Sequence, residues 1–293
     1  MLALDQITVD LLAKLNLTNL TIITLAKFKD KGLVSIRQTM TNKEYRWACI
    51  PALISHVLNN YDVSSCTYLD SQLYFFNSAK SLIQESEKSS ITLIANPANN
   101  AGNAVDALNR YPTQLITFKK DKPGLTALKW WKEHRISWCL NYHDVGKRYD
   151  QQDLNDLVQQ FNAIYIIDNP AYTINQSTIK QYTIFSECKL YAYNLQQKPF
   201  EIIFYNFDHL DANTKTINLN SYNLSTTAIN HLYKPYLGHL AAISKTVKSL
   251  IKKEKIKQLS LSITDLPTYK YTYKDALLSN LYKELNSWKQ IAI

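Results

Sequence analysis

The segment "CTYLDSQLYFF", residues 66–76, separates two apolar, β-prone runs with the polar triplet Asp70-Ser71-Gln72. The first run predicts a buried strand, and burying an unpaired carboxylate beside it is costly. Side chains alternate faces along an extended chain, so Asp70 and Gln72 are expected on the same side. Their oxygens could bind a hard divalent cation such as Mg²⁺ or Mn²⁺. In the alternative, which the spacing alone favours, Asp70 caps a turn and Gln72 faces solvent.

Short β-prone runs alternate with helical patterns through about residues 1–210. This alternation predicts an α/β layered sheet. Ligands of open α/β sheets bind beyond the carboxyl ends of the strands, and Asp70 directly follows a predicted strand. Residues 225–258 are predicted to be helical and become strongly basic. The predicted strands include residues 65–69, 73–76, 91–96, 114–118, 163–168 and 200–207.

The composition excludes several common classes of site. The 293 residues carry a net charge of +9, from 33 Lys and Arg against 24 Asp and Glu. This charge suits an anionic partner such as a nucleotide, a phosphate-bearing lipid or a nucleic acid, although solubility explains it at least as well. Only 5 glycines occur, and the chain contains neither GxGxxG nor GxxxxGK[ST]. Rossmann dinucleotide sites and P-loops are therefore excluded.

The sequence also predicts the compartment. The four cysteines are scattered without a CxxC pair, which argues against a disulfide framework or a zinc site. No run approaches the roughly 18–20 uncharged apolar residues of a membrane span, and the N-terminus lacks a basic signal-peptide region. We therefore expect a reduced, cytoplasmic protein. The lysines of residues 245–257 suggest peripheral contact with anionic lipid, but a solvated charged face is the favoured interpretation. No nucleic-acid-binding module is recognised.

A series of ordered segments from about the first residue to about residue 240 resembles the GT-A family of nucleotide-diphospho-sugar glycosyltransferases. The similarity is to the glycogenin-like members found in bacterial surface-polysaccharide loci. That family writes "YLDADLYFF" or a close variant where this chain has "YLDSQLYFF", residues 68–76. The other similar segments are "EYRWACIPALISHVL" (44–58), "YPTQLITFKKDKPGLTALKWW" (111–131), "WCLNYHDVGKRYDQQDL" (138–154), "FYNFDHL" (204–210) and "LYKPYL" (232–237).

The resemblance implies a GT-A-like, Rossmann-type layered sheet with a helical, basic C-terminal extension. An N-terminally incomplete nucleotide-sugar domain would cover residues 1–210, and the extension would cover residues 211–293. The implied function is transfer of a sugar from a nucleotide-diphosphate donor to a glycan or a lipid-linked acceptor, in surface-polysaccharide synthesis.

The resemblance also implies roles for individual residues. Asp70 and Gln72 would occupy the family's DxD motif and hold Mn²⁺ or Mg²⁺, and Asp208 would add a third metal ligand. Asp150 and Gln151 would lie beside the donor sugar at the reacting centre and act as the catalytic residues. The nucleotide-sugar-binding residues would be Asp70, Gln72, Gln114, Asn175 and Asn206.

The chain departs from the family pattern at several positions. Gln72 replaces a carboxylate, and Asn206 and Asp208 stand where the family has histidines. The family's first strand and helix have no counterpart, because "MLALD" resembles its second strand. A true truncation, a mis-set start codon and a degenerate paralogue are competing explanations. The alternative function is therefore a non-catalytic pseudo-glycosyltransferase that binds a glycan or a protein.

Two further expectations concern residues outside these motifs. His134 and His143 lie nine residues apart, which does not match metal-ligand spacing, so they are predicted to face solvent or to be satisfied within the fold. Trp131 and Trp138 are predicted to be core residues, and Cys139 is predicted to be structural. Without the first strand, the apolar segment at residues 20–25 would be exposed, which predicts either self-association or an open nucleotide pocket.

Overall fold

The computed structural model describes residues 1–37, 40–96, 110–141, 152–194, 197–207, 210, 216–217, 224–253 and 270–271. The chain forms two compact units, one of residues 26–209 and one of residues 1–25 together with residues 210–293. The division predicted from the sequence, into residues 1–210 and 211–293, stays a prediction.

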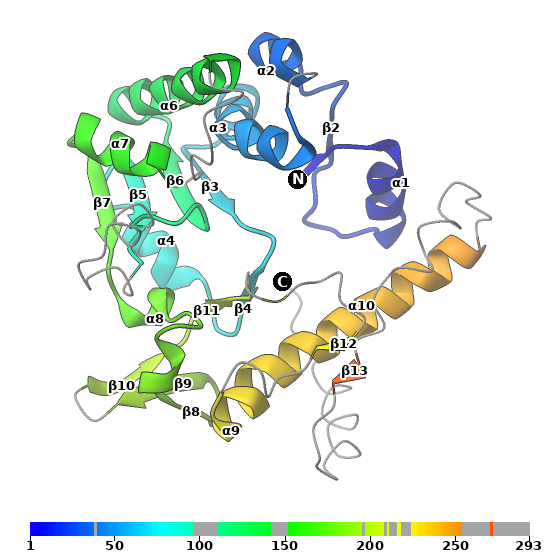
Figure 1. The fold of residues 1–293 in the computed structure, drawn as a ribbon, viewed down its shortest axis with the longest axis vertical. Helices are drawn as coiled ribbons and strands as arrows, with labels where there is room; N and C mark the ends of the chain where they lie inside the picture. Colours follow the sequence, from blue (N-terminus) through cyan, green and yellow to red (C-terminus); the bar gives the residue numbers. More distant parts are fainter. Residues whose placement is uncertain are drawn as a thin grey trace. The chain divides into compact units, whose positions relative to one another are not determined.

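A four-stranded mixed sheet forms the centre of the 26–209 unit (Figure 1). Its strand order is β3-β6-β5-β7. Strands β5 and β7 are parallel, whereas β6 is antiparallel to both of its neighbours. The predicted α/β class is therefore confirmed. The strands are β3 (Ser65–Leu69), β5 (Ile91–Ile94), β6 (Leu115–Lys119) and β7 (Ile164–Ile167).

Both faces of the inner strands are covered, which explains their continuous apolar sequences. Helices α3, α6 and α7 pack on one face, around the fully buried Trp131, which stacks on Phe118 with ring centroids 5.9 Å apart. This confirms the prediction for Trp131. The opposite face packs against α4, α8 and β11. The helices are α3 (Asn42–Asn60), α4 (Lys80–Ser86), α6 (Lys122–Asn141), α7 (Gln152–Gln160) and α8 (Pro170–Thr173).

Strand β3 corrects one expectation from the sequence. It was predicted to be fully buried, but Ser65, Thr67 and Leu69 are exposed, and Leu69 is 42 % exposed. Cys66 and Tyr68, on the other face, pack against the α3, α6 and α7 layer. The physical reason is coverage, because the α3, α6 and α7 layer packs on one face of β3 and the side chains on its other face are exposed.

Two smaller sheets complete the 26–209 unit. Strand β4 (Leu73–Phe75) pairs antiparallel with β11 (Phe204–Asn206). This pairing places the last strand of the unit beside the residues that directly follow Asp70-Ser71-Gln72. Strands β8, β9 and β10 form an antiparallel sheet of order β10-β9-β8. The remaining elements are α2 (Lys31–Ile36), η3 (Ile179–Gln181), β8 (Thr183–Ser186), β9 (Leu190–Asn194) and β10 (Gln197–Glu201).

The other unit contains two parallel two-stranded sheets and a long helical segment. Strand β2 pairs with β1, and although Ile23 within the segment at residues 20–25 is buried, Leu25 is 39 % exposed. Self-association through this segment stays a prediction. No described helix combines the length and apolar character needed to cross a membrane. The elements are β1 (Leu2–Ala3), α1 (Gln6–Leu15), β2 (Ile23–Thr24), β12 (Thr216–Ile217), α9 (Thr226–Ala228), η5 (Ile229–Tyr233), α10 (Lys234–Lys253) and β13 (Lys270–Tyr271).

Candidate functional site

The strand register brings several chain segments to one edge of the central sheet. Leu69 at the end of β3 pairs with Leu115 at the start of β6. Ile94 at the end of β5 pairs with Ile167 at the end of β7. The carboxyl ends of β3, β5 and β7 therefore lie at the same edge as the start of β6. This is the edge at which ligands of α/β sheets bind.

Asp70 caps the turn that follows β3. Its Oδ1 accepts a hydrogen bond from the Gln72 backbone N–H at 2.8 Å, which is the geometry of an Asx turn. Its own backbone N–H donates to the Gln114 carbonyl at 2.9 Å. The expected extended alternation of Asp70 and Gln72 is therefore wrong, because the chain turns between β3 and β4. A carboxylate offers about four lone-pair positions, so capping the turn does not use up its capacity as a ligand.

Strand β11 brings Asn206 to the same place. Its side-chain Nδ2 donates to the Gln114 Oε1 at 2.9 Å, although 92 residues separate the two in sequence. The Phe207 backbone N–H donates to the Gln72 carbonyl at 3.0 Å. Asn206 is 9 % exposed, so its amide is held within the fold rather than in bulk solvent. We call Asp70, Gln72, Gln114 and Asn206 together the Asp70 cluster.

Asn175 takes part in a different hydrogen-bond network. Its Oδ1 accepts from the backbone N–H groups of Ser177 at 2.9 Å and Thr178 at 3.2 Å, and so caps a local turn. Its Nδ2 donates to the Oδ1 of Asn96, just beyond β5, at 3.1 Å. These bonds tie Asn175 to the residues that follow β5. Within the described part of the chain they do not join it to the Asp70 cluster.

Three predicted site residues lie outside the described residues: Asp150, Gln151 and Asp208. His143 lies outside them as well. Helix α7 begins at Gln152, directly after the predicted catalytic pair in sequence. The catalytic and third-ligand assignments therefore stay predictions.

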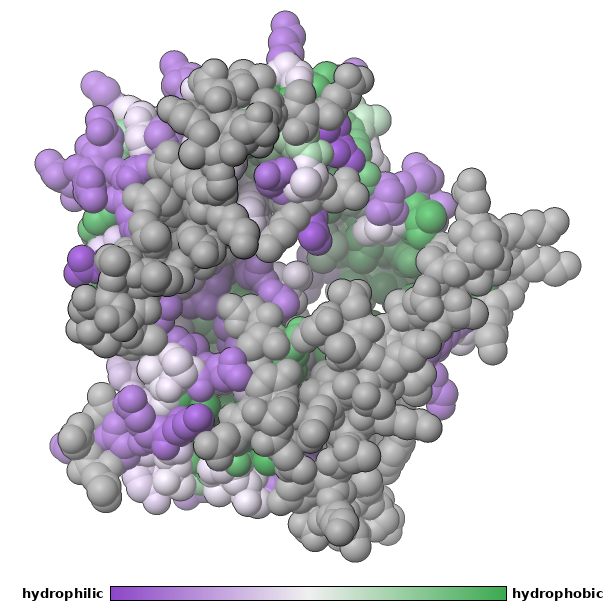
Figure 2. Space-filling model, viewed as in Figure 1, coloured by the Kyte–Doolittle hydropathy of each residue, from purple (hydrophilic) through white to green (hydrophobic). Residues whose placement is uncertain are grey.

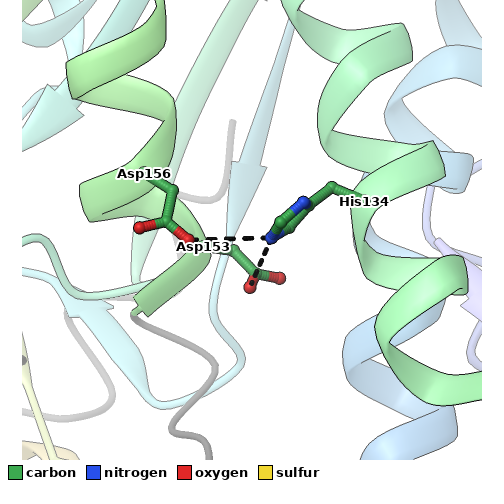
Figure 3. Close-up of side chains that lie close together, drawn as sticks. All are labelled: His134, Asp153 and Asp156. Atoms are coloured by element: carbon green, nitrogen blue, oxygen red, sulfur yellow. Dashed lines mark ion pairs between the residues drawn. The ribbon is translucent and has the colours of Figure 1, made fainter. Parts of the chain in front are cut away.

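A second polar cluster lies between helices α6 and α7 (Figure 3). The Nε2 of His134 lies 3.8 Å from the Oδ1 of Asp153 and 3.6 Å from the Oδ2 of Asp156. This group was not predicted from the sequence, where His134 was compared only with another histidine. The signal that could have found it is the pair of aspartates three residues apart, which one face of a helix presents together. We call these three residues the His134 cluster.

Two buried cysteines and one partly buried cysteine are poor nucleophiles. Burial raises the pKa of Cys139 to about 11 and that of Cys49 to about 12. Burial also raises the pKa of Cys66 to about 11. A thiol must ionise before it can attack, so these three stay protonated and unreactive near neutral pH. The geometry therefore agrees with the structural role predicted for Cys139.

Comparison with known proteins adds one relative without an assigned function. The chain is 28 % identical over 191 residues to "Uncharacterized protein YfnF" of Bacillus subtilis (strain 168). The match covers 62 % of this chain and 63 % of the length of the relative. No family model matches the chain, and no solved structure matches it. The name of this relative states no function, so the match does not assign a chemistry to this chain.

Proposed function

We propose that the chain binds a nucleotide-diphosphate sugar at the Asp70 cluster and transfers the sugar to a glycan or a lipid-linked acceptor. One observation carries the proposal. Four of the residues that the family resemblance assigns to nucleotide-sugar binding come from separate segments, yet main-chain and side-chain hydrogen bonds join them. They also lie at the carboxyl edge of the sheet, where such ligands bind.

The donor set of the Asp70 cluster suits a hard divalent cation. It combines the Asp70 carboxylate with side-chain amide oxygens, and oxygen ligands are those that Mg²⁺ and Mn²⁺ prefer. Asp70 and Gln72 would hold the ion, with Asp208 as a further ligand. When bound, such a cation stabilises the negative charge that develops on a departing diphosphate. Gln72 contributes no charge, so we expect a weak metal site.

The remaining residues of the site would bind and orient the donor. An amide side chain offers two N–H donors and a carbonyl acceptor, so Gln114 and Asn206 can bond to phosphate or sugar oxygens while bonding to each other. Their mutual hydrogen bond fixes both amides before the ligand arrives, which lowers the entropy cost of binding. Asp150 and Gln151 would stabilise the positive charge on the sugar carbon as the bond to the diphosphate breaks.

A non-catalytic binding module is the second candidate function. The observation that favours it is the composition of the Asp70 cluster, because Asp70 is its one carboxylate and the other three side chains are uncharged amides. Such a site could retain affinity for a glycan or a nucleotide after losing strong metal binding. In that case the sheet edge would serve recognition rather than chemistry.

Calorimetry and a donor-hydrolysis assay test the two candidates together. Uridine and guanosine diphosphates are titrated into the full chain with Mn²⁺ and with EDTA, and hydrolysis of the matching nucleotide sugars is followed. A transferase should bind in a Mn²⁺-dependent way and hydrolyse a donor, and Asp150→Asn should abolish hydrolysis without changing the melting temperature. The control is Asp62→Asn, at an exposed position.

The outcomes separate cleanly. Binding without hydrolysis supports the binding module. Mn²⁺-independent binding shows that the metal role of Asp70 and Gln72 is wrong. Absence of binding to either nucleotide contradicts nucleotide-sugar recognition altogether. A large loss of stability in Asp150→Asn would make that residue a structural carboxylate.

A further inference from the structure

The His134 cluster has the composition of a metal site. One imidazole nitrogen and two carboxylate oxygens, from different helices, all lie within 4.8 Å of one another. Helix α6 contributes His134, and α7 contributes Asp153 and Asp156 from one face (Figure 3). Imidazole together with carboxylate is a ligand set of divalent transition metals such as zinc and manganese.

The distances in the cluster fit a shared ion better than direct hydrogen bonds. The imidazole Nε2 is 3.6 Å from one carboxylate oxygen and 3.8 Å from the other. A charged N–H to carboxylate bond is about 2.7–2.9 Å long, so both separations are too great for one. Ligands at about 2.0–2.2 Å from a single cation lie roughly 3–3.6 Å apart. The two nitrogen–oxygen separations therefore need to close by only a few tenths of an ångström to share one ion. The two carboxylate oxygens lie within 4.8 Å of each other, and rotation of the aspartate side chains can bring them closer.

Neighbouring side chains already orient two of the three groups. The indole of Trp130 stacks on the His134 ring, with centroids 4.7 Å apart and an interplanar angle of 14°. Arg135 pairs with the Oδ2 of Asp153, while the Oδ1 of that carboxylate faces His134. The side chains of both members of this pair are buried, with that of Arg135 4 % and that of Asp153 3 % exposed. Metal ligands are commonly held by such outer partners, which fix their direction.

The cluster is also open to solvent on one side. The side chain of His134 is 31 % exposed and that of Asp156 is 28 % exposed, so an ion could enter and could keep water as its remaining ligands. On the side of the view where α6 and α7 lie in Figure 1, the coloured surface is largely hydrophilic (Figure 2). Arg135 balances the charge of the buried Asp153, and the carboxylate of Asp156 adds a negative charge that attracts a cation.

We propose that His134, Asp153 and Asp156 bind one divalent transition-metal ion that links helix α6 to the first turns of helix α7. The ion is structural, and the proposal is independent of the nucleotide-sugar function. The bound ion holds the beginning of α7 against α6. This part of α7 directly follows Asp150 and Gln151 in sequence. A bound ion stabilises the folded state in proportion to its affinity for that state.

Zinc titration of the full chain tests the proposal. Zn²⁺ is titrated in competition with a chromophoric chelator, in a Cys188→Ser background so that the exposed thiol cannot bind the metal. We expect one equivalent of Zn²⁺ to bind and the melting temperature to rise. His134→Gln and Asp156→Asn should each weaken binding at least tenfold. The matched controls, His239→Gln and Asp62→Asn at exposed positions, should not change it.

Two further measurements keep the test decisive. The same stoichiometry in Asp70→Ala shows that the ion is not bound at the Asp70 cluster, whereas loss of binding in Asp70→Ala overturns the assignment. Imidazole ¹⁵N spectra of the unsubstituted histidines cover the case in which the variants fail to fold. One of the 6 histidines should shift at one equivalent. The proposal is overturned if no imidazole ¹⁵N signal shifts, or if the signals of several histidines shift weakly. It is also overturned if His134→Gln keeps full affinity for Zn²⁺.

Discussion

Asparagine at position 70 separates the charge of this side chain from its turn-capping hydrogen bond. The Asp70 Oδ1 accepts from the Gln72 N–H at 2.8 Å, and the Oδ1 of an asparagine can accept the same bond. Asp70→Asn should therefore change the free energy of unfolding by less than about 0.5 kcal/mol. Asp70→Ala removes the acceptor and should cost about 0.5–1.5 kcal/mol, the net value of a hydrogen bond. For a domain of this size that corresponds to a loss of roughly 1–6 °C in melting temperature.

Nucleotide-diphosphate binding should respond differently, because the two variants should affect it alike. If Asp70 is the charged cation ligand, both variants should weaken Mn²⁺-dependent nucleotide-diphosphate binding at least tenfold, or about 1.4 kcal/mol. Thermal melting and calorimetry on the same preparations compare the two effects. The reasoning is refuted if Asp70→Asn binds nucleotide as well as the unsubstituted chain does. A marked loss of stability in Asp70→Asn would equally contradict the Asx-turn geometry.

Three other predictions concern the core, an ion pair and the thiols. Trp131→Ala should lower the free energy of unfolding by about 3–5 kcal/mol in a denaturant titration, while Val34→Ala, at a 69 % exposed position, should change it little. Hydrogen bonds from Lys88 and Tyr165 lower the pKa of Glu85, so their stabilising effect is present above its unfolded pKa and lost as pH falls through the folded value. The stability difference between the unsubstituted chain and Glu85→Gln, measured from about pH 6 to pH 3, should therefore shrink, and a constant difference would contradict it. Cys188→Ser should remove the one rapid thiol reaction of the native chain with a disulfide reagent, because Cys188 is the exposed cysteine.

The fold class could be predicted because the strands of the central sheet carry strong local signals. The runs that form β5, β6 and β7 are largely apolar, and helical spacing precedes β5 and separates β6 from β7. The position of Asp70 at the carboxyl end of a strand of the central sheet also followed from the sequence, because Asp70 directly follows an apolar run. Both inferences use properties that short segments carry by themselves.

The strand directions and the side-chain partners could not be predicted in the same way. Nothing within the β6 sequence states that it runs antiparallel to β3 and β5, because direction depends on the connections and the packing. The exposed face of β3 depends on which elements cover it. The hydrogen bond between Asn206 and Gln114 and the meeting of His134 with Asp153 join distant segments, so they arise only from tertiary structure.

Hydrogen–deuterium exchange with a bound nucleotide diphosphate tests the central claim most directly. The full chain is compared with and without Mn²⁺ and saturating uridine or guanosine diphosphate, and peptides are followed across the 26–209 unit. The account predicts slower exchange in the turn at residues 70–73 and in β11, since these segments build the Asp70 cluster. Protection confined to other segments, with these two unchanged under saturating nucleotide, would contradict nucleotide binding at this edge of the sheet.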